Sequence, residues 1–265
     1  MLSIFFLPDP ERGNADDVPE ANKRTSLLTD VIALSKNGSV VFVTLAYIAL
    51  DFVGGSLTYW IPTYVDANHA NSSIFFGGST EFGVCTIIGG IGGVFAGVYF
   101  SKLLKKRFGI MCADALVCGI SLILCAPFLF CALLLLNSTT WLGWLLILLS
   151  VITVTAIWPL LPNIFLETVI PTRRALVSGL SNLFGNAFGD AISPVIVGHI
   201  KDKLLEYSTP YKALQYGLMI NVLVAAVGSL LFFISALFFK RDYRICKERM
   251  AQECINAPRT ENTKK

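Results

Sequence analysis

Long apolar runs alternate with short polar segments along most of this chain. Six runs dominate residues 40–240, and none of them contains a Lys or an Arg. Each is at least as long as the roughly 20 residues that a helix needs to cross the hydrocarbon core of a bilayer. The runs are residues 40–64, 79–101, 112–136, 141–169, 175–200 and 213–239. This pattern predicts an all-α fold, a polytopic transmembrane bundle of six helices.

The composition agrees with a membrane protein. Hydrophobic residues make up 54% of the chain and charged residues only 15%, which is outside the usual balance of soluble domains. The chain lacks the sequence motifs of serine hydrolases, zinc proteases and phosphate-binding loops. Its seven cysteines form no Cys-x-x-Cys pair. We therefore expect membrane lipids as its surroundings, and no enzyme activity, cofactor, metal or nucleic acid partner.

The charges of the connecting loops predict the orientation. Basic residues follow the second, fourth and sixth runs. Arg173 and Arg174 are the only basic residues between the fourth and fifth runs. Loops 65–78 and 137–140 contain no Lys or Arg, and loop 201–212 mixes both signs. By the positive-inside rule, both termini face the cytosol. The glycosylation sequons at Asn71 and Asn137 then fall on the opposite side.

The two ends of the chain read differently from its middle. Residues 1–39 are mostly polar and predict a cytosolic linker. The apolar residues 2–7, directly before Pro8, resemble the end of a preceding span. Residues 40–240 hold the six predicted helices, and residues 241–265 predict a cytosolic tail that is first basic and then disordered.

The second run carries a stripe of small residues. Gly89, Gly93 and Gly97 recur every four residues, so they share one face of a helix. Such a face lets a neighbouring helix approach closely. This face is either a sliding surface that opens and closes a pathway, or a static packing surface.

The fourth run contains two prolines, Pro159 and Pro162, which predict a kinked or broken helix. In transporters a broken helix often lines the substrate cavity. The other interpretation is a curved helix that only packs against its neighbours.

The fifth run is the most polar of the six. Ser178, Asn182, Asn186 and Asp190 recur at four-residue spacing and form one stripe, which is too polar to face lipid. Asp51, near the middle of the first run, is a second membrane-embedded carboxylate. These residues are candidates for a substrate or proton path. They would look the same if they only held helices together by hydrogen bonds.

Several motifs resemble Spinster-type lipid transporters of the major facilitator superfamily. The resemblance rests on four segments. They are Val-Ile-Pro-Thr-Arg-Arg at residues 169–174, Phe-Gly-Asp-Ala-Ile-Ser-Pro at residues 188–194, Gly-Ser-Leu followed by Trp-x-Pro at residues 55–62, and Phe-Phe-x-Pro-Asp-Pro-Glu-Arg-Gly at residues 5–13. It implies that the chain is the C-terminal half, helices seven to twelve, of a twelve-helix secondary transporter. It also implies a lysophospholipid or sphingosine-1-phosphate class of substrate, and a lysosomal, late endosomal or plasma membrane location.

The resemblance also implies partners: protons, and a missing N-terminal half or a full-length relative. Two other functions remain open, a transporter of a small polar solute such as a sugar and a non-transporting six-helix partner. Two positions depart from the family pattern. Ser101 replaces the expected Asp of the loop after helix eight, which puts an Asp-based cytosolic latch in doubt, and Asp51 replaces a small apolar residue.

The predicted orientation can be tested by glycosylation mapping. We expect glycosylation at Asn71 or Asn137 and none at Asn37, whose sequon lies on the predicted cytosolic side. Asn→Gln variants of each site, followed by glycosidase digestion and a gel-shift assay, identify the modified residue. Modification of Asn37 alone would mean that the topology is inverted.

Overall fold

The computed structural model describes residues 27–68 and 77–256, and within these ranges the regular structure is entirely helical. This confirms the all-α prediction. In chain order the elements are α2 (Leu27–Ser35), α3 (Gly38–Asn68), α4 (Gly78–Phe108), α5 (Ala113–Leu135), α6 (Thr140–Thr155), α7 (Leu160–Thr168), α8 (Pro171–Phe184), the π-helix η1 (Gly185–Asp190), α9 (Ser193–Leu204), α10 (Pro210–Leu218) and α11 (Ile220–Asn256).

Five of the six predicted runs form helices that are long and apolar enough to cross a membrane. Among the described residues these spans are Gly38–Ala67, Gly78–Arg107, Ala113–Leu135, Thr140–Thr168 and Pro210–Gln252. The remaining run, 175–200, lies in the interrupted rod of α8, η1 and α9. This rod is less apolar because it carries the polar stripe and ends in charged residues.

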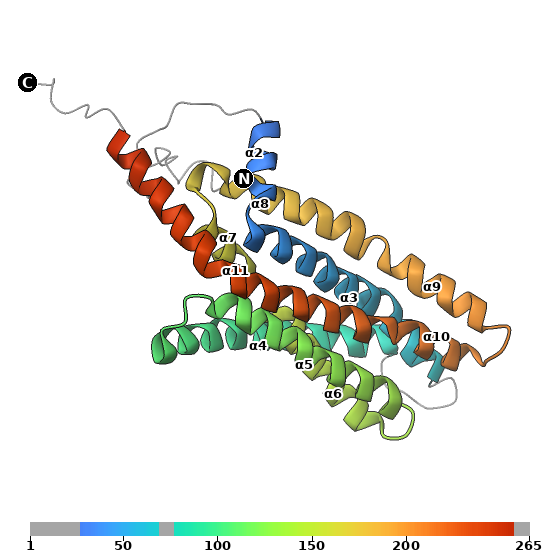
Figure 1. The fold of residues 1–265 in the computed structure, drawn as a ribbon. Helices are drawn as coiled ribbons and strands as arrows, with labels where there is room; N and C mark the ends of the chain where they lie inside the picture. The colour runs from blue at the N-terminus through green and yellow to red at the C-terminus, as the bar shows by residue number, and fades with distance from the viewer. Residues whose placement is uncertain (1–26, 69–76, 257–265) are drawn as a thin grey trace, which may run out of the picture.

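Helix α3 lies at the centre of the bundle (Figure 1). It packs against α11 on one side and against the rod of α8, η1 and α9 on another, while α5 pairs with α6 and α11, and α4 pairs with α6. Leu50 and Val53 of α3, Leu122 of α5 and Phe232 of α11 are almost fully buried in this core. By contrast Leu237 of α11 is 80% exposed, as expected for a side chain that contacts hydrocarbon.

The predicted glycine stripe of α4 packs directly on α6. A Cβ at Gly89 would lie 2.7 Å from Cγ1 of Val151, and a Cβ at Gly97 would overlap the carbonyl of Ala156. At Gly93 it would overlap the hydroxyl of Thr155, which itself donates a hydrogen bond of 3.0 Å to the Gly89 carbonyl. The stripe is therefore a close-packing surface in this conformation, and a sliding role stays a prediction.

Helix extends past both boundaries expected for the six-span region. Helix α2 lies inside the segment 1–39 that reads as a linker, because a short apolar stretch interrupts the polar residues there. Helix α11 continues beyond residue 240 through the basic segment to Asn256. No Gly or Pro lies between Gly228 and Pro258, and the basic segment is rich in good helix formers. Residues 1–26 and 257–265, with the expected remnant of a preceding span, lie outside the described residues.

The contact between α4 and α6 predicts that Gly97→Ala destabilises the bundle by about 1–3 kcal/mol, because the added methyl forces two backbones apart. The measurement is thermal unfolding of the purified chain in detergent. Gly90→Ala is the matched control, since a Cβ there meets nothing within 4 Å. Equal melting temperatures for the two variants would contradict close packing at Gly97.

Candidate functional site

Hydrogen bonds join the interrupted rod to α3. The hydroxyls of Thr44 and Ser181 lie 2.9 Å apart. The Tyr47 hydroxyl donates to Oδ1 of Asn182 at 3.0 Å. Nearer the C-terminal end of α3, Nε1 of Trp60 donates to the carbonyl of Pro194 on α9 at 3.0 Å. Only Asn182 of the stripe takes part in these bonds, and the face that packs on α3 is the adjoining one, which includes Ser181. That the stripe lines the interior of the assembled bundle stays a prediction.

The π-helix η1 is a local widening of the rod. The Ala191 amide donates to the Asn186 carbonyl five residues earlier, at 2.9 Å. Pro194 has no N–H to offer the Asp190 carbonyl, and the Ser193 hydroxyl donates to that carbonyl instead, at 3.1 Å. The widened turn displays Asn186 and Asp190 on the open side of the rod, where both are exposed.

Three glycines bring η1 into backbone contact with α3. A Cβ at Gly185 would overlap the Asp51 carboxylate, and a Cβ at Gly55 would overlap that of Asp190. At Gly189 a Cβ would lie 2.6 Å from the Ile48 carbonyl. The sequence analysis placed Gly185 and Gly189 only beside the stripe, because a single sequence does not say which helix packs on them.

This contact brings the two membrane-embedded carboxylates together. Asp51 is only 6% exposed, and its Oδ2 forms no hydrogen bond within the described chain. The Asp190 carboxylate lies against Gly55, one helical turn from Asp51 on α3. Both side chains line the same cavity.

The cavity has a volume of about 570 Å³ and lies between α3, α4, α6 and η1. Most of its wall is apolar, and its ionisable groups are the two carboxylates and the Tyr59 hydroxyl. Its lining residues are Asp51, Gly54, Gly55, Leu57, Thr58, Tyr59, Phe82, Thr86, Val151, Val154, Thr155, Trp158, Asn186, Asp190 and Pro194. An apolar hollow with a few convergent polar groups is the usual form of a small-molecule site.

The helix break predicted at the two prolines is present, and the connection it creates lines this cavity. Helix α6 ends at Thr155 and α7 begins at Leu160, with Pro159 at the N-cap and Pro162 in the first turn. Trp158 lies in the connection and lines both the main cavity and a smaller hollow of about 90 Å³. The smaller hollow also contains Pro162 and Asn182, together with Tyr47, Leu161, Phe165, Ser178 and Ser181.

The sequence analysis missed several lining residues, Tyr47, Thr58, Thr155 and Trp158 among them. For α3 a signal existed: Tyr47, Asp51 and Thr58 lie on one face of a helix, with Gly54 and Gly55 between them. This repeats, in weaker form, the polar stripe of the fifth run. The aromatic and threonine residues of the broken helix carry no such signal, because they are equally common in lipid-facing positions.

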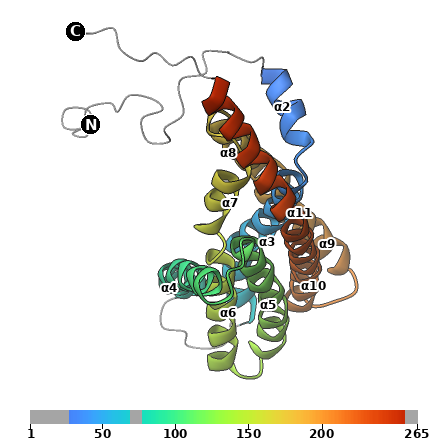
Figure 2. The ribbon, with the colours of Figure 1, turned by 60° about the vertical axis from the view of Figure 1, so that its left-hand side comes forward.

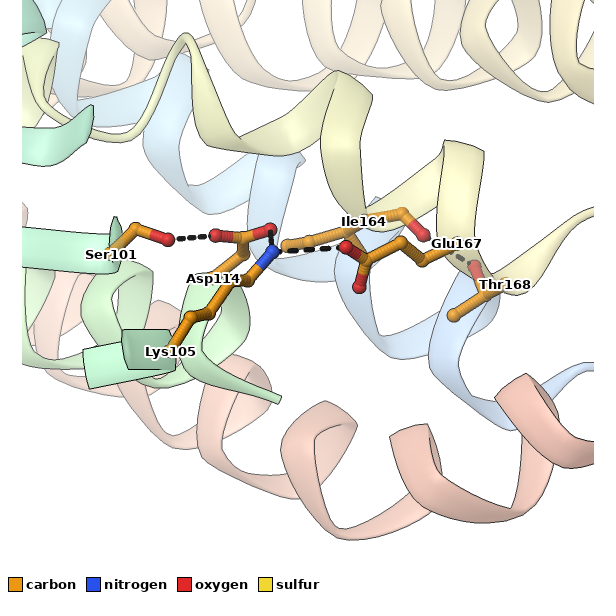
Figure 3. A network of polar contacts seen from close by, with 6 residues as sticks. All are labelled: Ser101, Lys105, Asp114, Ile164, Glu167 and Thr168. Carbon is orange, nitrogen blue, oxygen red and sulfur yellow. Dashed lines mark hydrogen bonds and ion pairs between the residues drawn. The ribbon is translucent and has the colours of Figure 1, made fainter. Parts of the chain in front are cut away.

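A second polar cluster ties three helices together at the end predicted to be cytosolic (Figure 3). Nζ of Lys105 on α4 lies 2.7 Å from Oδ2 of Asp114 on α5 and 2.9 Å from Oε1 of Glu167 on α7. The Ser101 hydroxyl donates to Oδ1 of Asp114, whose side chain is 1% exposed. Position 101 holds Ser instead of the family's Asp, but a carboxylate is still present beside it, because Asp114 of α5 contacts the Ser101 hydroxyl.

Arg173 and Arg174, which the sequence assigned to a loop, lie in the first turn of α8, because Pro171 starts the helix there, and they hold α8 in place. Nε of Arg173 lies 2.8 Å from Oδ1 of Asp30 on α2. Arg174 donates to the carbonyls of Leu166 and Val169, which α7 leaves open at its end. Of the two predicted glycosylation sites, Asn137 is exposed in the turn after α5, and Asn71 lies outside the described residues. The described part of the chain contains no cluster of metal-ligating side chains.

Comparison with known proteins identifies the class. A model of the Major Facilitator Superfamily matches residues 1–194. The chain belongs to this superfamily. Its fold also resembles a bacterial homologue of the human lysosomal transporter Spinster, crystallised in an inward-facing and unoccupied conformation. That likeness has a TM-score of 0.65 at 16% identity and covers 84% of this chain and 53% of the other.

Within the superfamily the chain is similar to Spinster proteins. It is 32% identical to protein spinster homolog 1 of Xenopus tropicalis, over 98% of this chain and 52% of the relative. It is 29% identical to protein spinster homolog 3 of Danio rerio, with 98% and 53% covered. It is 31% identical to the sphingosine-1-phosphate transporter SPNS2 of Danio rerio, with 91% and 50% covered. The chain thus spans about half the length of the relatives it matches.

The Lys105 cluster predicts that Lys105→Met destabilises the chain by about 1–3 kcal/mol, because Asp114 is left buried with only the Ser101 hydroxyl as partner. Partial exposure of Lys105 keeps the value at the lower end of this range. Thermal unfolding is the measurement, and Lys106→Met, which removes an exposed charge, is the control. Recovery of stability in Lys105→Met/Asp114→Asn would confirm the cause. No difference between Lys105→Met and Lys106→Met would contradict it.

Proposed function

We propose that this chain forms the C-terminal, six-helix wall of a secondary transporter for a lysolipid-like amphiphile. The observation that carries the proposal is the cavity between α3, α4, α6 and η1, with apolar walls and two carboxylates at one side. An amphiphile with one chain and a charged headgroup matches this division. The hydrocarbon chain of the amphiphile would lie along Leu57, Phe82 and Val151, and its headgroup would lie near Asp190.

The relatives support the same class of substrate. One of them is named a sphingosine-1-phosphate transporter, and such a molecule carries a phosphate, an ammonium group and a single hydrocarbon chain. An ammonium group would be attracted to Asp51 and Asp190, and the phosphate would need basic groups from elsewhere. Since the described part of the cavity wall has no Lys or Arg, we assign those groups to the other half of the transporter.

A sugar-like solute fits the cavity less well. Sugar sites need polar groups distributed around the ligand, whereas here the polar side chains lie mainly on α3 and η1 and the opposite wall is largely apolar. A non-transporting six-helix partner of a full-length relative is the remaining alternative. It would use the same exposed face of the rod as a docking surface and would move nothing itself.

The proposed half-transporter can be tested by reconstitution into liposomes. We expect no saturable uptake of fluorescent lysophosphatidylcholine by the 265-residue chain alone, because the second wall of the cavity is missing. Uptake is expected when the N-terminal half of a Spinster relative is co-reconstituted. Uptake by the chain alone would overturn the half-transporter proposal, and uptake of glucose but not of the lysolipid by the assembled pair would favour the sugar alternative.

We further propose that Asp190 takes part in transport. In the assembled transporter, Asp190→Asn is expected to lower initial uptake by about tenfold, or about 1.4 kcal/mol, and to make the remainder insensitive to pH. This exchange keeps the size and hydrogen bonding of the side chain but removes its ionisable proton. Asp51→Asn, at the buried partner, is the companion variant and is expected to weaken the pH dependence in the same direction.

The matched control is Asp202→Asn on α9, because it removes an exposed carboxylate that does not line the cavity. Surface abundance and melting temperature of each variant establish that it is folded. Unchanged uptake by Asp190→Asn at every pH, with normal abundance, would leave Asp190 a packing residue.

A further inference from the structure

A second pocket, separate from the transport cavity, lies at the end of the bundle predicted to be cytosolic. It has a volume of about 210 Å³ and is formed by α2, the connection between α7 and α8, and the last turns of α11. Figure 2 shows these elements gathered at one end of the molecule. The pocket shares no lining residue with the cavity between α3, α4, α6 and η1.

The lining of this pocket is strongly basic. It contains Lys36, Arg173, Arg241 and Arg249, against a single carboxylate, Asp242. That carboxylate is buried and already accepts a hydrogen bond of 2.8 Å from the Ser39 amide.

The cations of the pocket differ in how they are paired. Arg173 is held by Asp30, whereas Lys36, Arg241 and Arg249 form no ion pair within the described residues. The pocket therefore has a surplus of positive charge with free donors.

The helical continuation of α11 creates this arrangement. Arg241, Ile245 and Arg249 recur every four residues and so lie on one face, which turns toward α2 and the α7–α8 connection. Arg244 and Lys247 belong to the same basic segment but do not line the pocket. Had the chain become irregular at residue 240, these charges would have had no fixed positions.

An apolar groove adjoins the basic pocket across α2. It has a volume of about 330 Å³ and lies between α2, α3 and α8. Its wall includes Val41, Leu45, Leu180 and Phe184, and its surface is almost free of polar atoms. Leu34 lines both hollows, so the basic pocket and the apolar groove meet at this one buried side chain.

We propose that the pocket and the groove together bind an anionic phospholipid of the cytosolic leaflet. The phosphate lies among Lys36, Arg241 and Arg249, and an acyl chain follows the groove along α3 and α8. Basic pockets between transmembrane helices on the cytosolic side are suited to such headgroups, because guanidinium groups donate two parallel hydrogen bonds to a phosphate. The lipid would join α2 and α11 to the interrupted rod and so stabilise the cytosolic end of the bundle.

The test is native mass spectrometry of the purified chain in a neutral detergent, titrated with phosphatidic acid or with phosphatidylcholine of the same acyl chains. A neutral micelle removes the general attraction of basic residues to an anionic surface. We expect phosphatidic acid to bind at least about tenfold more tightly than phosphatidylcholine, because only its headgroup carries net negative charge. Equal binding of the two lipids would overturn the proposal.

Matched double variants locate the site. Arg241→Gln/Arg249→Gln is expected to weaken phosphatidic acid binding roughly tenfold or more, while Arg244→Gln/Lys247→Gln changes it by less than about twofold. Both variants remove two charges from the same segment of α11. Lys36→Gln is expected to weaken binding from the opposite wall without altering α11. Equal losses in the two double variants would mean diffuse attraction and would overturn the assignment.

A third arm distinguishes a lipid from a free phosphate. Glycerol 3-phosphate and inorganic phosphate present the same chemistry without an acyl chain, and we expect neither to displace phosphatidic acid at equal concentration. Displacement by either one would overturn the lipid site in favour of a site for soluble anions. Because these measurements concern binding to the cytosolic pocket, their outcome is independent of whether the assembled protein transports a lysolipid.

Discussion

The backbone contact between α3 and η1 is the feature on which the rest of this structure depends. Because Gly55, Gly185 and Gly189 have no Cβ, the two elements approach until each glycine packs against a carboxylate or a carbonyl of the facing element. A membrane gives helices little hydrophobic reason to associate, so close packing and hydrogen bonds have to hold them. Here the packing comes from the glycines, and the hydrogen bonds come from Thr44, Tyr47 and Trp60 of α3.

The same contact explains why two costly carboxylates are tolerated in a transmembrane bundle. Asp51 is enclosed where η1 meets α3, and Asp190 opens from the widened turn into the cavity, so neither has to face lipid. At the end predicted to be cytosolic a different solution applies, because Lys105 neutralises Asp114 and Glu167 across three helices. Asp51 and Asp190 have no cationic partner among the described residues and can meet a ligand or a proton, whereas Asp114 and Glu167 are paired with Lys105.

The sequence was enough to predict the helical class, five of the spans and the polar stripe, because hydropathy and four-residue spacing are local properties. It did not predict the π-helix or the meeting of Asp51 with Asp190, since both depend on which helix packs against Gly185 and Gly189. The helical extension past residue 240 was missed for another reason. The sequence analysis described residues 241–265 as basic and then disordered and assigned no helix to the basic part, although Lys, Arg and Glu are good helix formers.

The most direct test of the central claim, that the cavity between α3, α4, α6 and η1 receives the amphiphile, is photo-crosslinking in the assembled transporter. The probe is a lysophosphatidylcholine with a diazirine in its chain, and mass spectrometry locates the adducts. The account predicts adducts at Thr86, Val151 and Trp158 that excess unlabelled lysolipid abolishes. Adducts confined to outward-facing residues such as Leu230 and Leu237, and insensitive to competition, would contradict it.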